Sequence, residues 1–285
     1  MTTGWREPML ATLTEDRFSD EGWIYERKLD GVRAIVVRNG SRVDIFSRNH
    51  KSMNASYPEL IEAFAAQPVQ QFVVDGEIVA FDGEQTSFEK LQARIHQTHP
   101  DKIRASGVAV FLYLFDLLDV DGKDITGFPL RDRKQLLNET INFDDPLRYS
   151  QHRNTHGEAF YAEACEKGWE GIIAKRANSR YRVGHRSPDW LKFKCVKDQE
   201  MVIGGFTEPQ GSRTGFGALL VGYYDGKRLR YAGKVGTGYN RELLRTLRSQ
   251  LDDLEQDESP FAEPVRERGA HWVRPELVGQ VGFSE

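Results

Sequence analysis

Short segments rich in apolar residues, separated by tight glycine turns, dominate the start of the chain. These segments are residues 23–29, 34–37 and 43–46, and Asp30-Gly31 and Asn39-Gly40 stand between them. Short runs of β-branched and aromatic residues bounded by turn residues are typical of strands. Asp-Gly and Asn-Gly are favoured in the turns that join antiparallel strands. The sequence therefore predicts antiparallel sheets.

Helical spacing is confined to a few segments. We expect helices at 57–66, from Ser87 to about His96, at 131–140, and from a capping box of Thr155 and Glu158 to near Gly168. Further strands are expected at 72–81 (interrupted at Asp75-Gly76), 108–118, 170–175 and 190–195. The predicted class is α+β, with antiparallel sheets and flanking helices.

After Lys197 the pattern changes. Strands are expected at 201–206, 216–224, 229–234 and 277–283, with one helix capped by Asn240 and followed by an acidic segment. Several short strands with one helix are typical of a small barrel. We expect two domains, residues 1–197 and 198–285.

Composition excludes some classes of protein. The chain has 285 residues and a net charge of -4. It contains no run of about 18 apolar residues, the length that a helix needs to cross a membrane. Its start lacks the basic and then apolar build of a signal peptide. Cys165 and Cys195 form no C-x-x-C pair, a pattern typical of the reducing cytosol that argues against a disulfide framework or a zinc ribbon. We expect a cytoplasmic protein.

A basic cluster lies just before the expected boundary. It consists of Arg180, Arg182, His185, Arg186, Lys192, Lys194 and Lys197, interleaved with Tyr181, Trp190 and Phe193. Such a cluster forms either a solvated face or a phosphate-binding groove. Only the motifs elsewhere in the chain can distinguish a solvated face from a phosphate-binding groove.

Lys28 stands where a predicted strand meets a turn, in Lys28-Leu29-Asp30-Gly31-Val32-Arg33. A lysine must be neutral to attack a phosphate. Its ordinary pKa is about 10.4, so nearby cations, a metal or desolvation must lower that pKa. The motif alone is weak evidence because Asp-Gly turns are common.

Five further motifs follow at the ends of predicted strands. They are Ser47-Arg48-Asn49, Asp75-Gly76-Glu77, Phe115-Asp116, Glu170-Gly171-Ile172-Ile173-Ala174-Lys175 and Trp190-Leu191-Lys192-Phe193-Lys194. In a strand Lys192 and Lys194 share a face. Charged groups of this kind are found at phosphoryl-transfer sites, where positioning and charge neutralisation dominate catalysis.

In this order the six motifs resemble the covalent nucleotidyltransferases, which include ATP-dependent DNA ligases, RNA ligases and mRNA capping enzymes. The full set is most similar to DNA ligases, and among them to the ligase module of bacterial non-homologous end-joining enzymes. The resemblance covers nearly the whole chain. It implies a nucleotidyltransferase (adenylation) domain followed by an OB-fold barrel.

The resemblance also implies roles. Lys28 would take AMP from ATP, Glu26 would lie near the adenine amino group, Phe115 would stack on adenine, and Glu77 would bind the ribose. Asp30 and Arg33 would arrange the nick ends, and Arg48 would bind phosphate. Lys192 and Lys194, with Lys175 as a lesser candidate, would bind the AMP phosphate. Glu170, together with Glu77, would hold Mg²⁺ or Mn²⁺. The implied partners are nicked duplex DNA and the end-binding protein Ku, and the implied state is a monomer.

One departure from the family is visible at the end of the chain. Family members usually finish with an element rich in Arg, Asp and Lys, whereas this chain stops at Val281-Gly282-Phe283-Ser284-Glu285. Either the sequence is a piece of a longer chain or the element comes from elsewhere. We expect a barrel cut short and an impaired first step. Two alternative functions stay open: an RNA ligase or GTP-using capping enzyme, and a non-catalytic nucleic-acid-binding module.

Overall fold

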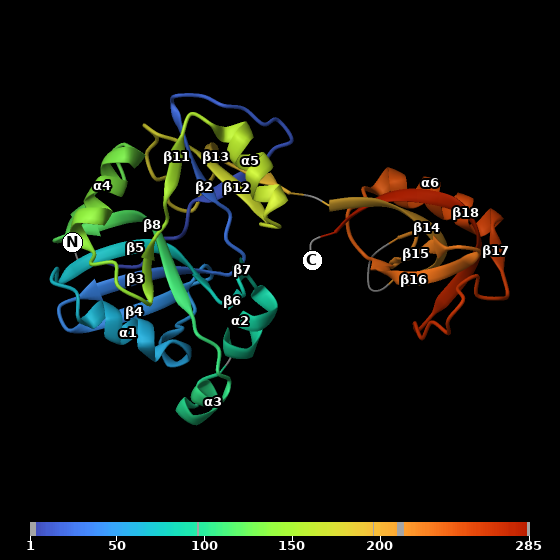
Figure 1. Ribbon diagram of the computed structural model, residues 1–285, viewed down its shortest axis with the longest axis horizontal. Helices are drawn as coiled ribbons and strands as arrows, with labels where there is room; N and C mark the ends of the chain where they lie inside the picture. Colours follow the sequence, from blue (N-terminus) through green and yellow to red (C-terminus); the bar gives the residue numbers. More distant parts are fainter. Residues whose placement is uncertain (1–3, 96, 196, 210–213, 284–285) are drawn as a thin grey trace. The chain divides into compact units, whose positions relative to one another are not determined.

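The computed structural model describes residues 4–95, 97–195, 197–209 and 214–283 (Figure 1). The chain divides into two compact units, Met1–Cys195 and Val196–Glu285. The expected boundary was at residue 197. The expected helix end at His96, the side chain of Lys197, and residues 284 and 285 lie outside the description.

The first sheet of unit 1, called sheet A here, has five strands in the order β1-β13-β12-β2-β11. Their bounds are Leu10–Leu13 (β1), Arg186–Lys194 (β13), Gly171–Arg176 (β12), Trp23–Arg27 (β2) and His152–Asn154 (β11). β12 is antiparallel to both of its neighbours, whereas β1 runs parallel to β13.

The second sheet of unit 1, called sheet B here, has the order β10-β8-β5-β3-β4, with β9 paired to β8. The bounds are Leu147–Tyr149 (β10), Phe111–Val120 (β8), Gln71–Val79 (β5), Val32–Asn39 (β3), Arg42–Ser47 (β4) and Lys123–Asp124 (β9). A short hairpin pairs β6 (Phe81–Asp82) with β7 (Gln85–Thr86). β10 is parallel to β8. The sheets are mainly antiparallel, as expected, and the two short strands β1 and β10 depart from this by running parallel to their neighbours.

Unit 1 also contains five described helices. They are α1 (Pro58–Ala65), α2 (Phe88–Ile95), α3 (Pro100–Ala105), α4 (Leu130–Thr140) and α5 (Gly157–Glu166), with a 3-10 turn η1 at Asn54–Ser56. α1 buries Leu60 and Phe64 in the core of sheet B, and α5 buries Phe160 in that of sheet A. A third apolar cluster contains Phe115 of sheet B and Trp190 of sheet A, so the inner faces of the two sheets meet.

Two local expectations are wrong. β5 continues through Asp75-Gly76, and the irregularity is a register shift in its pairing with β8. The predicted capping box is absent because Thr155 has a φ of +66° and offers the helix no cap. The amide of Glu158 instead donates to the Ser19 hydroxyl at 3.2 Å.

Cys165 and Cys195 form a disulfide, contrary to the expectation from their spacing. The two residues are 30 positions apart, yet their Cα atoms lie 5.3 Å from each other. α5 packs on β12, and β12 pairs with β13, which brings the end of the helix to the end of the strand. A count of cysteines cannot show this proximity.

Unit 2 is a five-stranded sheet with one helix. Its order is β16-β15-β14-β18-β17, formed by Arg228–Val235, Leu219–Asp225, Lys197–Thr207, Ala270–Phe283 and Glu255–Gln256. α6 (Arg241–Asp253) is capped by Asn240, which accepts from the Leu243 amide at 2.7 Å, as predicted. Within the described part of unit 2 the strand ladder is open, and an isolated bridge from Leu229 to Phe261 joins β16 to the segment after β17. The predicted α+β class is confirmed.

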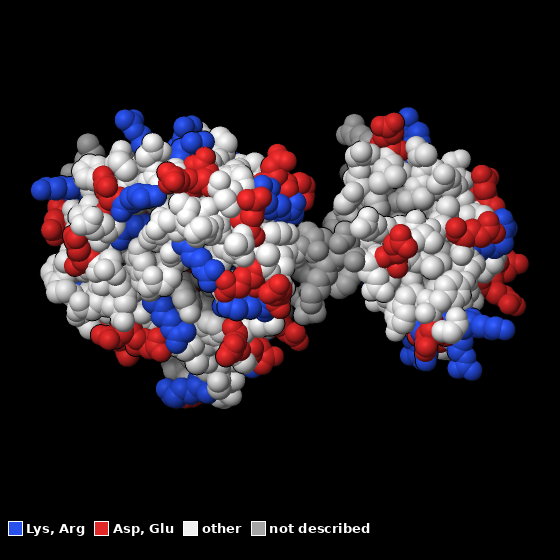
Figure 2. Space-filling model, turned by 45° about the horizontal axis from the view of Figure 1, so that its top comes forward, with Lys and Arg blue, Asp and Glu red and all other residues white. Residues whose placement is uncertain are grey.

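The surface carries both signs of charge. On the face shown in Figure 2, acidic and basic side chains are intermixed over each unit, in keeping with the small net charge. Among the described helices, none has the length and apolar character needed to cross a bilayer.

Candidate active site

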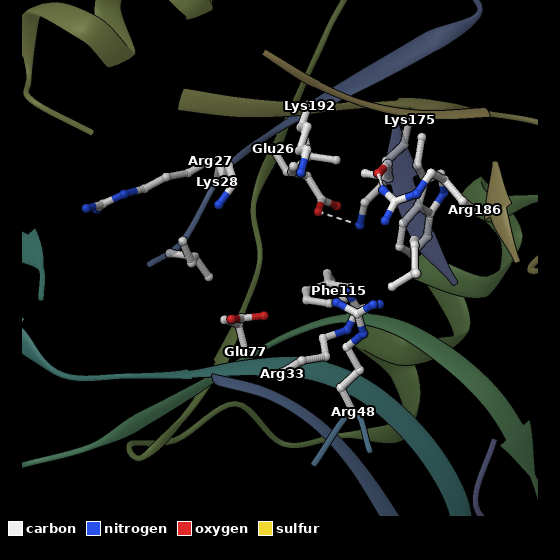
Figure 3. A pocket seen from close by; sticks show the side chains of 15 residues that line it. Glu26, Arg27, Lys28, Arg33, Arg48, Glu77, Phe115, Lys175, Arg186 and Lys192 are labelled. Carbon is white, nitrogen blue, oxygen red and sulfur yellow. Dashed lines mark hydrogen bonds and ion pairs between the residues drawn. The ribbon is translucent and has the colours of Figure 1, made fainter. Parts of the chain in front are cut away.

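A cavity of about 270 Å³ lies between sheet A and sheet B of unit 1. Figure 3 shows Lys28, Lys175 and Lys192 of sheet A on one side of it, and Glu77, Arg33 and Arg48 from the sheet B segments on the other. Its lining residues are Leu10, Ala11, Glu26, Arg27, Lys28, Leu29, Arg33, Arg48, Glu77, Phe115, Ile173, Lys175, Arg186, Trp190 and Lys192. The structure therefore brings together eight of the eleven residues predicted for the site.

Lys28 is fixed by the backbone on both of its sides. Its amide donates to the Gly171 carbonyl at 2.9 Å, immediately after β2 ends. A Cβ atom on Gly31 would overlap the carbonyl oxygen of Ile78, so the turn packs directly against β5. Only glycine fits this close approach. The turn therefore sets where the Lys28 side chain leaves the strand.

Asp30, Glu170 and Lys194 do not line the cavity, but the last two connect to it through Lys28. The Lys28 amine contacts one carboxylate oxygen of Glu170, and Lys194 Nζ lies 3.3 Å from the other. Burial and the neighbouring Glu170 raise the pKa of Asp30. Acidic and basic groups are thus interleaved around the end of β2.

Lys192 extends the positive charge into the cavity. It pairs with Ile173 while Lys194 pairs with Gly171, so both lysines lie on one face of β13, as the period-two pattern predicts. Burial, Lys194 and Lys28 lower the pKa of Lys192. The site holds more positive than negative charge at this end and would be stabilised by an anionic ligand.

Glu26 lies in a buried cluster of charges behind the cavity. One of its carboxylate oxygens accepts from Lys134 at 2.5 Å and the other from Lys175 at 2.7 Å. Burial opposes ionisation, but the two ammonium groups prevail and lower the pKa of Glu26. Lys134 belongs to no motif, and our sequence reasoning missed it. The available signal was its place on the buried face of α4 that also carries Leu130 and Leu137.

Phe115 forms an aromatic surface in the cavity under two cations. The Arg33 guanidinium lies 4.7 Å from its ring centroid and Lys175 Nζ lies 4.2 Å from it. Arg33 is held by both oxygens of Asp75, with Nη2 at 2.6 Å from Oδ2. The Tyr181 hydroxyl donates to the same oxygen at 2.6 Å. Arg33 is therefore pinned over the ring rather than free to move.

Glu77 projects from β5 into the cavity (Figure 3). Burial raises its pKa to about 7, although Arg33 and Lys28 act in the opposite direction. No hydrogen bond to its carboxylate is found within the described part of the chain. Glu77 is thus an acid at the cavity wall that lacks a fixed partner.

The basic cluster seen in the sequence does not form one groove. Its aromatic members Tyr181, Trp190 and Phe193 are buried. Arg182 lies 3.5 Å from Asp189, and with Arg180 it lines a separate cavity. Arg186 and Lys192 line the cavity between the sheets. Alternation along β13 divides the cluster between the core and different parts of the surface.

This geometry defines a cavity suited to an anionic ligand that has an aromatic part. Residues 8–194 match the family model for the ATP dependent DNA ligase domain, and residues 212–285 match that for the ATP dependent DNA ligase C terminal region. The chain belongs to the ATP-dependent DNA ligase family.

Curated relatives agree with this assignment. The chain is 38% identical over 290 residues to the multifunctional non-homologous end joining protein LigD of Pseudomonas aeruginosa, covering 99% of this chain and 34% of the relative. It is 36% identical to the corresponding DNA repair protein of Mycobacterium tuberculosis, covering 98% and 36%. The chain thus spans about a third of the length of these relatives.

Solved structures show the same fold. The ligase domain of M. tuberculosis LigD has a TM-score of 0.59 at 34% identity, with 98% of this chain and 90% of that one covered. A mycobacterial DNA ligase D complexed with ATP and MES has a TM-score of 0.60 at 34% identity, covering 98% and 89%.

Proposed function

We propose that this chain seals nicks between 3'-hydroxyl and 5'-phosphate ends of duplex DNA through a covalent lysyl-AMP intermediate on Lys28. The carrying observation is the Lys28 amine, fixed by the Gly31 turn at a cavity that offers an aromatic surface and cations from two sheets. Unit 1 would be the adenylation domain and unit 2 the OB-fold domain.

In the first step the Lys28 Nζ lone pair forms a bond to the α-phosphorus of ATP. The phosphorus–oxygen bond to pyrophosphate breaks, and pyrophosphate leaves with the electron pair. Glu170 already contacts the amine and is placed to accept its proton. Arg48, Arg186 and Lys192 line the cavity and would offset negative charge as it develops.

The nucleoside would be held at the opposite part of the cavity. Phe115 offers a ring face for the adenine. Glu26 would accept from the adenine amino group, since a carboxylate has lone pairs beyond the two used by Lys134 and Lys175. Glu77 would bind a ribose hydroxyl. Adenine recognition would thus depend on the Glu26 carboxylate, which Lys134 and Lys175 hold in its orientation.

The later steps use the same residues on DNA. The 5'-phosphate of the nick attacks the AMP phosphorus and displaces Lys28, and the 3'-hydroxyl then attacks the adenylylated 5'-phosphate and displaces AMP. Arg33, Arg48 and Asp30 would arrange these ends, and Lys192 and Lys194 would bind the AMP phosphate. Arg33 can act only through guanidinium hydrogens that Asp75 and the Met9 carbonyl leave unused.

Glu77 and Glu170 fit a divalent metal in the chemistry of their donors. Carboxylate oxygens suit Mg²⁺ and Mn²⁺, and the pKa of Glu77 is raised because no group fully compensates its charge. No cluster of three or more metal-binding side chains exists among the described residues, so substrate oxygens would complete the shell. When bound, the metal would neutralise phosphate charge as a Lewis acid.

The names of the relatives support DNA end joining as the pathway. We infer that the protein acts in the bacterial cytosol as a monomer, with Ku as a partner at DNA ends. Both family models describe DNA ligases, which disfavours an RNA ligase or a GTP-using capping enzyme.

A sealing assay tests the proposal. The chain with ATP and Mg²⁺ or Mn²⁺ should join a nicked DNA duplex, and a duplex whose nicked strand is RNA should be joined more slowly. Lys28→Ala should abolish joining, whereas Lys90→Ala, at an exposed pair with Asp82, should not change it. Sealing by Lys28→Ala, or a preference for RNA nicks, would contradict the proposal.

A further inference from the structure

A second cavity, of about 260 Å³, lies beside the first and shares two of its lining residues, Arg27 and Leu29. Leu29, Tyr113, Tyr149, Ser150, Gln151, His152, Arg153, Phe160 and Trp169 line it together with Arg27. No aspartate or glutamate lines it, although 43 of the 285 residues are acidic. Its arginines are Arg27 and Arg153, and Arg153 is paired with Glu163, so Arg27 is the arginine of this wall that has no carboxylate partner among the described residues.

Arg27 is the unusual residue of this second cavity. It is half-buried, yet it has no hydrogen bond or ion pair to any described residue, and its Nε is a buried donor without an acceptor. The other buried or half-buried arginines described in unit 1 all bond an oxygen: Arg6, Arg17, Arg33, Arg38, Arg94, Arg133 and Arg148. A buried donor left unpaired costs free energy, so an acceptor from outside would satisfy it.

Trp169 holds the Arg27 guanidinium in one orientation. The guanidinium carbon lies 4.3 Å from the Trp169 ring centroid. A cation–π contact of this kind orients the guanidinium, and arginine can bind phosphate through two of its N–H groups at once. His152 adds a second buried nitrogen, Nδ1, without a partner at the same wall.

The location indicates where the phosphate would come from. Arg27 precedes Lys28, and their side chains leave the strand in different directions in Figure 3. A nick that reacts at Lys28 continues as DNA on both sides, with one phosphate per 3.4 Å of axis on each strand. Because the two cavities share Arg27 and Leu29, we expect phosphates next to a nick at Lys28 to pass close to the second cavity.

We propose that Arg27, stacked on Trp169, binds a DNA backbone phosphate adjacent to the nick and so positions the DNA rather than ATP. This inference rests on the proposed function, since it needs DNA at Lys28. It assigns the second cavity to the phosphodiester backbone, with no reading of sequence.

Arg27→Gln in the full chain tests this site, with binding of a fluorescent nicked duplex measured over a range of salt. We expect the Kd to rise about fivefold to tenfold and the slope of log K against log salt to fall by the contribution of about one phosphate. Arg27→Lys should recover the salt slope but only part of the affinity, because lysine cannot stack and donate in the same way. Arg17→Gln is the matched control, since Arg17 also stacks on an aromatic ring but has partners of its own. It should change neither quantity.

Self-adenylylation in the absence of DNA distinguishes the two possible ligands of Arg27, a phosphate of ATP and a phosphate of the DNA backbone. Because Arg27 also lines the first cavity, we expect the KM for ATP of Arg27→Gln to rise by a smaller factor than the Kd for nicked DNA, and the transfer of AMP also shows that the variant is folded. A rise in the KM for ATP that matches the loss of DNA affinity would assign Arg27 to ATP and overturn the inference. Unchanged DNA affinity and salt slope would overturn it as well. Failure of the wild-type chain to take AMP would count against the proposed function alone, because the binding measurement needs no reaction.

Discussion

At the scale of single residues, the charge balance behind the cavity rests on Glu26. One buried carboxylate faces the ammonium groups of Lys134 and Lys175. Glu26→Gln leaves two buried cations without a counter-charge, and removal of one partner from a buried pair costs about 3–5 kcal/mol. We expect a loss of this size in the free energy of unfolding, measured by urea denaturation.

The control for this loss is an exposed pair. Lys167→Met breaks a contact with Glu163 on the surface of α5, where water screens the charges. It should destabilise the protein far less than Glu26→Gln. Equal losses in the free energy of unfolding would show that the buried ion pairs of Glu26 contribute no more to stability than the exposed pair.

Glu77 predicts a pH dependence of stability. Its pKa is about 7 in the folded protein and near 4.5 in the unfolded chain. Between these values the folded state holds a proton that the unfolded state has released, so the contribution of Glu77 to stability falls as the pH rises. Glu77→Gln removes the effect. The difference in unfolding free energy between Glu77→Gln and wild type should shift in favour of the variant by about 1–3 kcal/mol from pH 5 to pH 8. Urea denaturation at both pH values measures this difference. A pH-independent difference would contradict the raised pKa.

Sequence reasoning found the residues that belong to motifs and missed those that act through packing. Lys28, Glu77, Phe115 and Lys192 were expected at the site and do line the cavity. Lys134 was not, because its contact with Glu26 depends on how α4 packs against the sheet. No spacing within one segment encodes a partner 108 positions away.

At the scale of elements, the turn after β2 controls the site. Gly31→Ala would place a methyl group against the Ile78 carbonyl oxygen, so β3 or β5 would have to move. We expect a loss of about 1–3 kcal/mol in stability, typical of overpacking, and at least tenfold slower adenylylation as Lys28 shifts. Gly127→Ala is the control because nothing lies within 4 Å of its Cβ position. Normal adenylylation by Gly31→Ala would contradict this role of the turn.

The disulfide joins the end of α5 to the residue after β13, next to the segment that carries Glu170. Closing a loop of this length restricts the unfolded chain, a contribution of about 2–4 kcal/mol. Reduction with dithiothreitol should lower the unfolding free energy by that amount, and Cys165→Ser should reproduce the effect and be insensitive to the reductant. Free thiols in the untreated protein would contradict the cross-link.

The longer elements were predictable from the sequence, and the shortest ones were not. β3, β4 and the Asn240-capped α6 follow the expected positions within a few residues. β1, β10 and β11 have only three or four residues, and they gain their structure from neighbours distant in sequence. The Thr155 cap fails because Thr155 has a positive φ and lies one residue before His156, which is the N-cap of α5.

At the scale of the whole molecule, the candidate site lies in one unit. Every residue of the main cavity belongs to residues 10–192, within unit 1. The sequence indicated two domains. It did not indicate that the strand ladder of unit 2, in its described residues, is open apart from an isolated bridge. Closure of a sheet depends on strand curvature, which hydrophobic periodicity does not report.

The central claim is that Lys28 carries AMP, and transfer of α-labelled ATP to the purified protein with a divalent metal tests it most directly. We predict an adduct with the stability of a phosphorus–nitrogen bond, cleaved by acid and stable to alkali. It should form from ATP and not from GTP, map to the peptide containing Lys28, and disappear in Lys28→Ala. Label on another residue, or an adduct that persists in Lys28→Ala, would contradict the account.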